Sequence, residues 1–243
     1  TTVLSGTVGH GGLVVVNGGS LGSGDISLSS DSTLLDISGS AAVSLPSIRG
    51  LGGISVQGQG LTADFSGAVD VRYLIVDQGA VARFSGAGVA NVGFLAQICT
   101  DPSCALKVNG SIELAGGSTL RLGLHNGVSY GSGFVGSISG AGSLRKSGDF
   151  YAFLTGVNTY SGGTQIDGGY VVLKPGNTLG TGPIVVSEPV GSTSGGGALL
   201  LSDGATLSNP ITISGTGPLL PGVPERYGAL QSECIAAPGC VNS

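Results

Sequence analysis

Methionine and tryptophan are absent from this sequence, and charged residues make up only 9% of its 243 residues. Surface helices normally carry a charged face, so this composition argues against amphipathic helices. Proline is limited to 10 residues and no Gly-X-Y period exists, which excludes a collagen-like chain. Glycine (48 residues) and apolar residues (40%) are abundant instead, and a disordered linker would contain far fewer apolar residues. The composition therefore predicts an all-β chain rich in turns.

Basic residues are also few. The nine Lys and Arg residues are scattered, the formal net charge is −5 and the pI is near 4.7. Nucleic-acid binding requires a basic patch, so this charge argues against a nucleic-acid partner and, equally, against an anionic membrane surface. No apolar run approaches the ~20 residues of a membrane-spanning helix. The sequence starts at Thr1 without a visible signal peptide, and we interpret it as a mature or excised segment.

Histidine, the residue most used in acid–base catalysis, occurs only twice. His10 lies in a glycine-rich segment and His125 precedes the turn signal Asn126-Gly127, so we expect both side chains in surface turns. No serine stands in a Gly-x-Ser-x-Gly motif between a strand and a helix, so a hydrolase nucleophile is not indicated. These patterns favour a non-enzymatic protein without a cofactor or a metal.

The carboxylate residues leave open the alternative that the protein is an enzyme, because some parallel β-helix proteins act on polysaccharides and such enzymes use pairs of carboxylates. Asp64, Asp70 and Asp77 fall in adjacent predicted strands and could line one outer face, as could Asp31 and Asp36. A stack of carboxylates without a basic partner is equally compatible with a solvated edge. A carbohydrate-active enzyme is therefore an alternative hypothesis.

The four cysteines form two close pairs, Cys99 with Cys104 and Cys234 with Cys240. Four cysteines allow three pairings. If the chain winds into a β-solenoid with about 20–25 residues per turn, or rung, the two cysteine pairs would lie roughly 25–30 Å apart along it. This is far beyond the ~7 Å Cα separation that a disulfide can bridge. We therefore expect two local disulfides and an oxidising compartment, the periplasm or the cell exterior. Zinc is disfavoured because the spacings are poor and neither histidine is near in sequence.

Apolar residues alternate with polar ones over much of the chain. Ile26 and Leu28, and likewise Ile54 and Val56, are spaced by two with a serine between them. This period is typical of strands with one buried and one solvated face. Glycine-containing bends separate the strands at short intervals.

The stretch from Leu154 to Leu173, LTGVNTYSGGTQIDGGYVVL, organises the rest of the chain. A turn signal at 158–163 precedes two β-forming runs, 164–166 and 170–173, which Asp167-Gly168-Gly169 separates. Extended pieces of three to five residues joined by such bends leave no room for a helix. The pattern predicts a chain that winds into a parallel β-solenoid.

The same stretch resembles the passenger-associated transport repeat of bacterial autotransporters. The matching segments are LTGVNTYSGGT, then GGYVVL, then NTLGTGP leading into IVV at 184–186, and the preceding ISGAGSLRKSG at 138–148 is similar to the usual lead-in. The resemblance covers 138–215. Residues 149–153 depart from it, because DFYAF is bulkier and more aromatic than the family's small, Thr-rich residues.

The chain also contains its own repeat. A shift of 157 residues places 6–28 on 163–186, so the N-terminal region is interpreted as a degenerate second copy. We therefore divide the chain into β-helix rungs at 1–137 with a disulfide-tied protrusion near 94–109, transport-repeat rungs at 138–215, and a loop with an incomplete further rung at 216–243. About 22 residues per rung would give roughly 11 rungs.

An aromatic cluster at 150–153 is the best candidate for a contact surface. Phe150, Tyr151 and Phe153 surround Ala152, so alternation should turn part of the cluster outward. The competing interpretation is that the rings stack inside a wide rung.

The resemblance implies a single-stranded right-handed parallel β-helix and a passenger exported by a Gram-negative bacterium through a C-terminal outer-membrane barrel that is absent from this chain. It implies a cell-surface or secreted, non-enzymatic stalk for adhesion, autoaggregation or virulence. Its partners would be a host or bacterial surface protein or glycan, or a second copy. A self-assembling extracellular fibre, built by end-to-end pairing of open rungs, is a further alternative.

Overall fold

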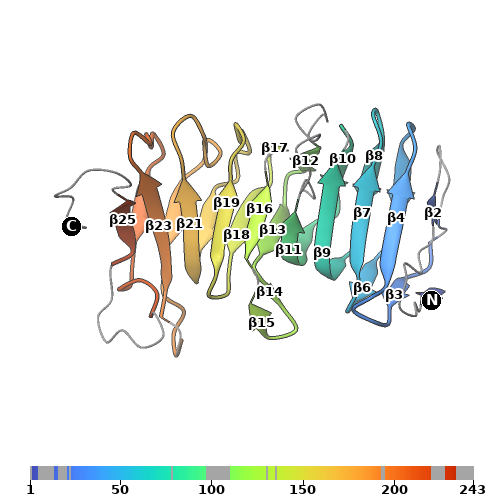
Figure 1. Ribbon diagram of the computed structural model, residues 1–243, viewed down its shortest axis with the longest axis horizontal. Coiled ribbons are helices and arrows are strands. Elements are labelled where there is room, and N and C mark those ends of the chain that lie inside the picture. The colour runs from blue at the N-terminus through green and yellow to red at the C-terminus, as the bar shows by residue number, and fades with distance from the viewer. Residues whose placement is uncertain are drawn as a thin grey trace.

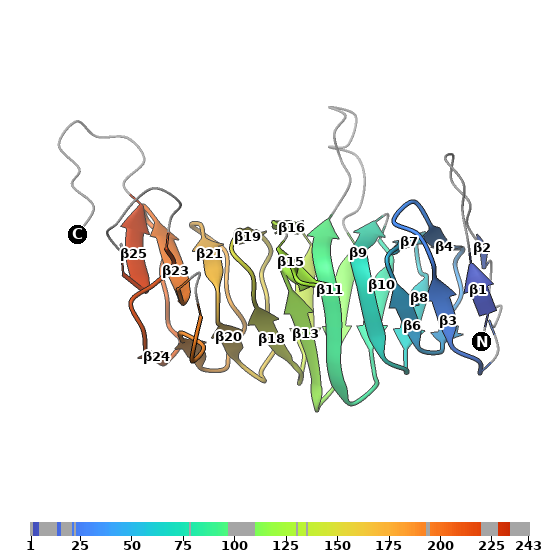
Figure 2. The ribbon, with the colours of Figure 1, turned by 90° about the horizontal axis from the view of Figure 1, so that it is seen from below.

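The computed structural model describes residues 2–4, 14–15, 21, 23–77, 79–96, 110–129, 131–134, 136–192, 195–219 and 228–233. These residues form strands, turns and bends, and none of them is helical, which confirms the predicted all-β class. Within the same ranges, no helix exists that could cross a membrane. The strands stand side by side along the long axis of the molecule, from β1 near the N-terminus to β25 near the C-terminus (Figures 1 and 2).

Three ladders of parallel strands make up the stack. The first ladder contains β1 (Thr2–Leu4), β3 (Ile26–Leu28), β6 (Ile48–Gly50), β9 (Val69–Asp77), β11 (Gly88–Ala96), β13 (Ser118–Leu122), β18 (Ser143–Lys146), β20 (Thr164–Ile166), β22 (Ile184–Val186) and β24 (Ile211–Ile213). The second contains β2 (Val14–Val15), β4 (Leu34–Ser38), β7 (Gly53–Gln57), β9, β11, β16 (Ser132–Phe134), β19 (Tyr151–Leu154), β21 (Gly169–Leu173), β23 (Gly197–Ser202) and β25 (Leu230–Glu233).

The third ladder is shorter. It contains β5 (Val43–Leu45), β8 (Thr62–Phe65), β10 (Val81–Phe84), β12 (Ser111–Leu114) and β17 (Ser137–Gly140). The long strands β9 and β11 belong to both the first and the second ladder, which joins these two into one 18-stranded sheet. An antiparallel hairpin, β14 (Leu124–His125) and β15 (Val128–Ser129), projects from the stack below β13 in Figure 1.

The chain passes through the ladders in a fixed order, so each strand pairs with one that lies a full repeat away in sequence. Ile26 pairs with Ile48 and Leu144 with Thr164, which are separations of 22 and 20 residues, whereas Leu199 and Leu230 are 31 residues apart. In the described part of the chain, the first ladder has ten strands, close to the roughly 11 rungs expected from sequence. Repeat length varies because insertions enter between the strands and leave the pairing intact.

Alternation decides which side chains enter the core. In β13, Leu120 and Leu122 are buried while Arg121 between them is half-buried, and the same pattern holds at Ile26 and Leu28. Apolar side chains from all three ladders meet in one hydrophobic core. The sequence prediction of one buried and one solvated face is confirmed, since period-2 alternation is a local property that each strand carries by itself.

Beyond β17, loops replace the strands of the third ladder, yet backbone pairing continues. The amide of Thr159 donates to the carbonyl of Ile138 (2.8 Å), and the amide of Thr181 donates to the carbonyl of Tyr160 (2.9 Å). The repeat-like segment therefore follows the strand stack of the N-terminal half and does not form a separate unit within the described ranges.

Candidate functional site

The predicted aromatic cluster lies on the outer face of the second ladder. Phe150, Tyr151 and Phe153 are 53%, 42% and 38% exposed, while Ala152 between them is buried. The rings of Tyr151 and Phe153 are stacked at 5.9 Å, and Tyr151 also stacks on Tyr170 of the next strand, β21, at 4.6 Å. The rings thus stand on the surface and not inside a wide rung.

Two further residues extend this surface. Phe94, on β11, is 39% exposed, and the ammonium group of Lys174 lies 5.6 Å from the centre of the Phe153 ring. Aromatic rings that remain in contact with water and border a cation are typical of contact surfaces, because their burial by a partner is favourable. We call Phe94, Phe150, Tyr151 and Phe153 the aromatic face. Phe94 was not among the residues predicted, since nothing in the sequence places it beside the other three.

A polar network occupies the outer face of the first ladder. Arg145 of β18 pairs with the buried carboxylate of Asp167, which also accepts hydrogen bonds from Gln165 and Ser187, both at 2.8 Å. The donors come from three successive repeats. Because this carboxylate is already fully engaged by donors, its arrangement is that of a structural ion pair.

Arg121 stands directly beside Arg145 in the ladder and donates to the hydroxyl of Ser147 at 3.1 Å. Burial, and after it the positive charge of Arg145, lowers the pKa of Arg121, while Asp167 and Asp70 oppose that shift. The repulsion between the two guanidinium groups is offset because the acidic side chains of Asp70 and Asp167 lie near them.

The expectation that His125 lies in a surface turn is wrong. The turn itself is present: Asn126 and Gly127 both have positive φ, as the Asn-Gly signal predicts. The imidazole, however, is only 4% exposed, and its Nε2 lies 3.7 Å from Asp70 Oδ1. The hairpin folds back onto β9 and β11, and this non-local contact buries a side chain whose local sequence indicates exposure. The other histidine, His10, lies outside the described residues.

Of the carboxylates that raised the enzymatic alternative, Asp64, Asp70 and Asp77 do not share one face. Asp64 belongs to the third ladder, whereas Asp70 and Asp77 stand near opposite ends of β9. Asp64 accepts a hydrogen bond from Ser85, and Asp31 forms an ion pair with Arg72 at 3.3 Å. Among the residues that the structure describes, no group of three His, Cys, Asp or Glu side chains is placed to hold a metal ion.

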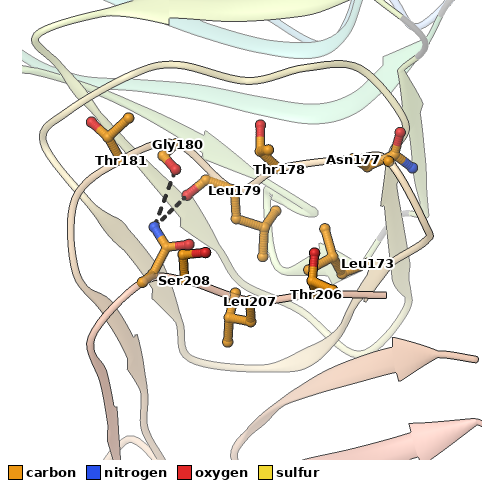
Figure 3. A pocket seen from close by; sticks show the side chains of 11 residues that line it. Leu173, Asn177, Thr178, Leu179, Gly180, Thr181, Thr206, Leu207 and Ser208 are labelled. Atoms are coloured by element: carbon orange, nitrogen blue, oxygen red, sulfur yellow. Dashed lines mark hydrogen bonds between the residues drawn. The ribbon is translucent and has the colours of Figure 1, made fainter. Parts of the chain in front are cut away.

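A pocket lies between the loops that follow β21 and β23 (Figure 3). Its volume is about 410 Å³. Asn209 closes one side by donating from Nδ2 to the carbonyl oxygens of Gly180 and Leu179, at 3.1 and 3.5 Å. The lining residues are Leu173, Gly176, Asn177, Thr178, Leu179, Gly180, Thr181, Thr206, Leu207, Ser208 and Asn209. None of these is titratable, so the lining supplies no acid–base group.

Two residues of the repeat-like motif are buried, although the sequence placed them in a turn. Tyr160 is 0% exposed, and its hydroxyl shares a 2.6 Å hydrogen bond with Thr164 Oγ1. Asn158 is 2% exposed: its Oδ1 accepts from the amide of Ile138 (2.9 Å), and its Nδ2 donates to the carbonyl of Thr178 (2.7 Å). Asn158 thus joins the repeat before it to the repeat after it, where no third-ladder strand is present.

Lys146, in the lead-in to the motif, is the buried cation of this region, with 1% exposure. Its Nζ donates to the carbonyl oxygens of Ser147 (2.6 Å), Gly148 (2.9 Å) and Gly168 (3.2 Å). Burial lowers the pKa of Lys146 from 10.5 to about 8, and the charge of Asp149 opposes part of that shift. The three carbonyl contacts hold two successive repeats together, so Lys146 has a structural role here.

We expect the Lys146→Met variant to lose stability relative to the parent chain as the pH rises from 8 to 10.5. The pKa of Lys146 is lower in the folded than in the unfolded chain, so in this interval the unfolded state binds more protons and the parent's free energy of unfolding rises with pH. One proton contributes at most about 1.4 kcal/mol per pH unit, and the variant lacks this gain. Burial raises the pKa of Tyr160, so its hydroxyl does not titrate in the same interval.

Urea unfolding followed by circular dichroism at pH 7, 8, 9 and 10 measures this difference. Lys174→Met is the matched control, because it makes the same substitution at an exposed lysine and removes no buried ammonium group. A constant difference between Lys146→Met and the parent would contradict the prediction.

Both predicted disulfides, Cys99 with Cys104 and Cys234 with Cys240, lie outside the described residues and stay predictions. Most of the degenerate copy at 6–28 and the protrusion beyond Ala96 also lie outside, while Phe94 to Ala96 belong to β11.

Comparison with known proteins supports the relation that the sequence motifs indicated. No family model and no solved structure matches the chain. The chain is 33% identical over 152 residues to a curated protein, the Adhesin BmaC autotransporter of Brucella suis biovar 1 (strain 1330). The match covers 59% of this chain and 4% of the adhesin, so the chain spans a small part of that protein's length. The chain is thus similar, over more than half of its residues, to a segment of an autotransporter adhesin.

Proposed function

We propose that this chain is a segment of an autotransporter passenger that acts at the bacterial surface as a non-enzymatic adhesive stalk. The observation that carries the proposal is the combination of a parallel strand stack with an exposed aromatic face, in a chain similar to an autotransporter adhesin. We further propose a right-handed, single-stranded parallel β-helix, because parallel strands joined by crossovers adopt the right-handed sense in nearly all proteins.

Stacking explains how such a segment would work as a stalk. Each repeat pairs with the next through backbone hydrogen bonds, so a folded repeat offers a template for the one that follows. Buried side chains such as Asn158 and Lys146 add contacts between repeats where strands are missing. In this proposal, residues 138–215 are transport-repeat rungs that support folding during export, and the chain is displayed on, or released from, a Gram-negative cell.

The aromatic face would make the adhesive contact. Its four rings are each at least 38% exposed, and they cluster on one side of the stack. Candidate partners are a host or bacterial surface protein, or a surface glycan. Burial of such rings stabilises a complex because it removes apolar area from water.

Adhesion of coated beads tests this proposal. Beads that carry the purified chain should adhere to cultured epithelial cells, and the triple variant Phe150→Ala, Tyr151→Ala, Phe153→Ala should reduce adhesion by at least about tenfold, since aromatic anchors commonly contribute 2 kcal/mol or more each. Val89→Ala is the matched control, because Val89 is 48% exposed on the first ladder. Circular dichroism checks that each variant is folded. Equal adhesion by the parent and the triple variant would contradict the proposal.

Self-association is a second candidate function, and the exposed, one-sided pairing of the last described strands favours it. Ile213 of β24 and Leu230 of β25 are 41% and 43% exposed, and within the described ranges these strands pair on one side only. Light scattering after size-exclusion chromatography, over a concentration series, separates the two candidates. A monomer at all concentrations would favour the stalk, whereas filaments would favour end-to-end pairing of the strand edges.

A further inference from the structure

The outward positions of the second ladder form a row of aromatic rings that is interrupted at one strand. Tyr73 pairs with Phe94, and Tyr151 pairs with Tyr170. Between these two pairs stands β16, whose central residue, Gly133, faces outward, and Gly131 directly precedes this strand. Gly133 pairs with Ala96 on one side and with Phe153 on the other, so Gly131, two residues earlier, lies between Phe94 and Tyr151. In Figure 2, β16 stands between β11 and β19.

The backbone does not require glycine at either position. Neither Gly131 nor Gly133 has a positive φ. A Cβ added to Gly133 would meet nothing within 4 Å, and one added to Gly131 would make only ordinary contacts, at 3.6 Å to Tyr151 O and 3.9 Å to Phe150 Cβ. Gly53 is different, because the Tyr73 ring lies 2.2 Å from the place of its Cβ. Among the residues that the structure describes, Gly131 and Gly133 therefore leave space beside the rings.

The width of this space matches one ring. Neighbouring strands are about 4.8 Å apart, so Phe94 and Tyr151 are separated by about 9.6 Å across β16. The Tyr151 and Tyr170 rings, one strand apart, stack at 4.6 Å. A ring placed over Gly131 and Gly133 would thus lie within the 4.5–7 Å stacking range of both Phe94 and Tyr151. Tyr170 stacks on Tyr151 from β21, the strand on the side away from β16, and Phe153 stacks on Tyr151 from within β19.

Polar groups at the rim favour a sugar over an aromatic side chain as the occupant. Ser129 lies two residues before Gly131, and Asp149 lies two residues before Tyr151. The Ser129 hydroxyl donates a 3.2 Å hydrogen bond to the Asp149 carboxylate at an exposed position. A carboxylate is a strong acceptor for ligand hydroxyl groups, and the Lys174 ammonium beside Phe153 is a donor. The net charge of −5 disfavours an acidic ligand. An apolar ring without hydroxyls would leave these groups unused.

We propose that the trough over Gly131 and Gly133, between Phe94 and Tyr151, binds the ring of a neutral pyranose, with Asp149 accepting hydrogen bonds from its hydroxyl groups. This inference rests on the proposed adhesive function and names the class of ligand for the aromatic face.

Saturation-transfer difference NMR with methyl β-D-glucopyranoside, methyl β-D-galactopyranoside and methyl α-D-mannopyranoside tests the proposal directly. At least one glycoside should receive saturation at its ring C–H protons, and sodium glucuronate should receive less. The Gly133→Phe variant fills the trough with the protein's own ring and should abolish the transfer. Gly133→Ala is the matched control, because a methyl group leaves most of the space open and should retain binding. Phe94→Ala and Tyr151→Ala should each weaken binding about tenfold, since each removes one stacked face.

The outcomes separate this inference from the proposed function. Transfer that survives Gly133→Phe, or no transfer to any of the three glycosides, would overturn the sugar site. If cell adhesion still depends on Phe150, Tyr151 and Phe153 in that case, the aromatic face binds a protein and the adhesive function stands. If glycoside binding follows the predicted pattern while adhesion is unaffected by the triple variant, the site exists and the adhesive function is wrong. Circular dichroism of Gly133→Phe, whose Cβ would meet no described atom within 4 Å, checks that loss of binding is not loss of fold.

Discussion

Replacing Tyr160 with alanine should lower the free energy of unfolding by about 3–5 kcal/mol, as is usual when a large buried aromatic ring is removed. Tyr160 is completely buried, and it is the largest of the fully buried side chains in the described residues. Its ring lies against Gly180 of the next repeat, where an added Cβ would approach the ring to 2.8 Å. The cavity would therefore open between two repeats, and urea unfolding followed by circular dichroism should show the loss.

Tyr160→Phe is the matched control for this prediction. It keeps the ring and removes only the hydrogen bond to Thr164, which also donates to the carbonyl of Leu179 at 3.4 Å. We expect a loss of about 1 kcal/mol, the net contribution of one such hydrogen bond. If Tyr160→Ala and Tyr160→Phe were equally destabilised, packing of the ring would not be what the residue contributes.

Replacing Asn158 with alanine should cost about 2–4 kcal/mol, because the buried amide of Ile138 loses its partner, at roughly 1–3 kcal/mol, and the part-buried carbonyl of Thr178 loses a hydrogen bond that contributes about 1 kcal/mol. These two groups belong to the repeats on either side of Asn158. The loss should be greatest between repeats. Hydrogen exchange should therefore show faster exchange at the amide of Ile138 than in the parent chain.

Two variants sharpen this second test. Asn177→Ala removes an amide that lines the pocket of Figure 3 and should change stability by no more than about 0.5 kcal/mol. Asn158→Asp keeps an oxygen for the Ile138 amide and removes the donor to Thr178, so its stability should lie between those of the parent and Asn158→Ala. Equal stability of Asn158→Ala and Asn177→Ala would refute the bridging role of Asn158.

The candidate contact surface was partly accessible from sequence. Alternation across 150–153 predicts that part of the cluster faces outward, and in the structure Tyr151 and Phe153 are exposed while Ala152 is buried, because side-chain direction along a strand is local. Alternation could not identify Phe94 as part of this surface. Ala96 and its partner Gly133 are separated by 37 residues, a repeat much longer than the 20 residues between Leu144 and Thr164, and no local pattern fixes that register.

Burial of polar side chains was the property that the sequence predicted least well. Asn158 and Tyr160 occur in a segment with strong turn signals, and His125 precedes an Asn-Gly turn, yet all three are buried. Turn signals report backbone conformation and not what packs against the segment. Only the position of each segment against the neighbouring repeat decides whether its side chains reach water.

By itself, the sequence determined that this chain is all-β, rich in turns and built of short strands with one buried face, because composition and period-2 alternation act within each strand. The tertiary structure decided which strands stand next to one another, since pairing along the stack depends on repeat lengths that insertions change. That pairing brings Phe94 beside Gly131 and Gly133 and sets Asn158 between Ile138 and Thr178. The open trough and the inter-repeat hydrogen bonds both follow from contacts between residues far apart in sequence.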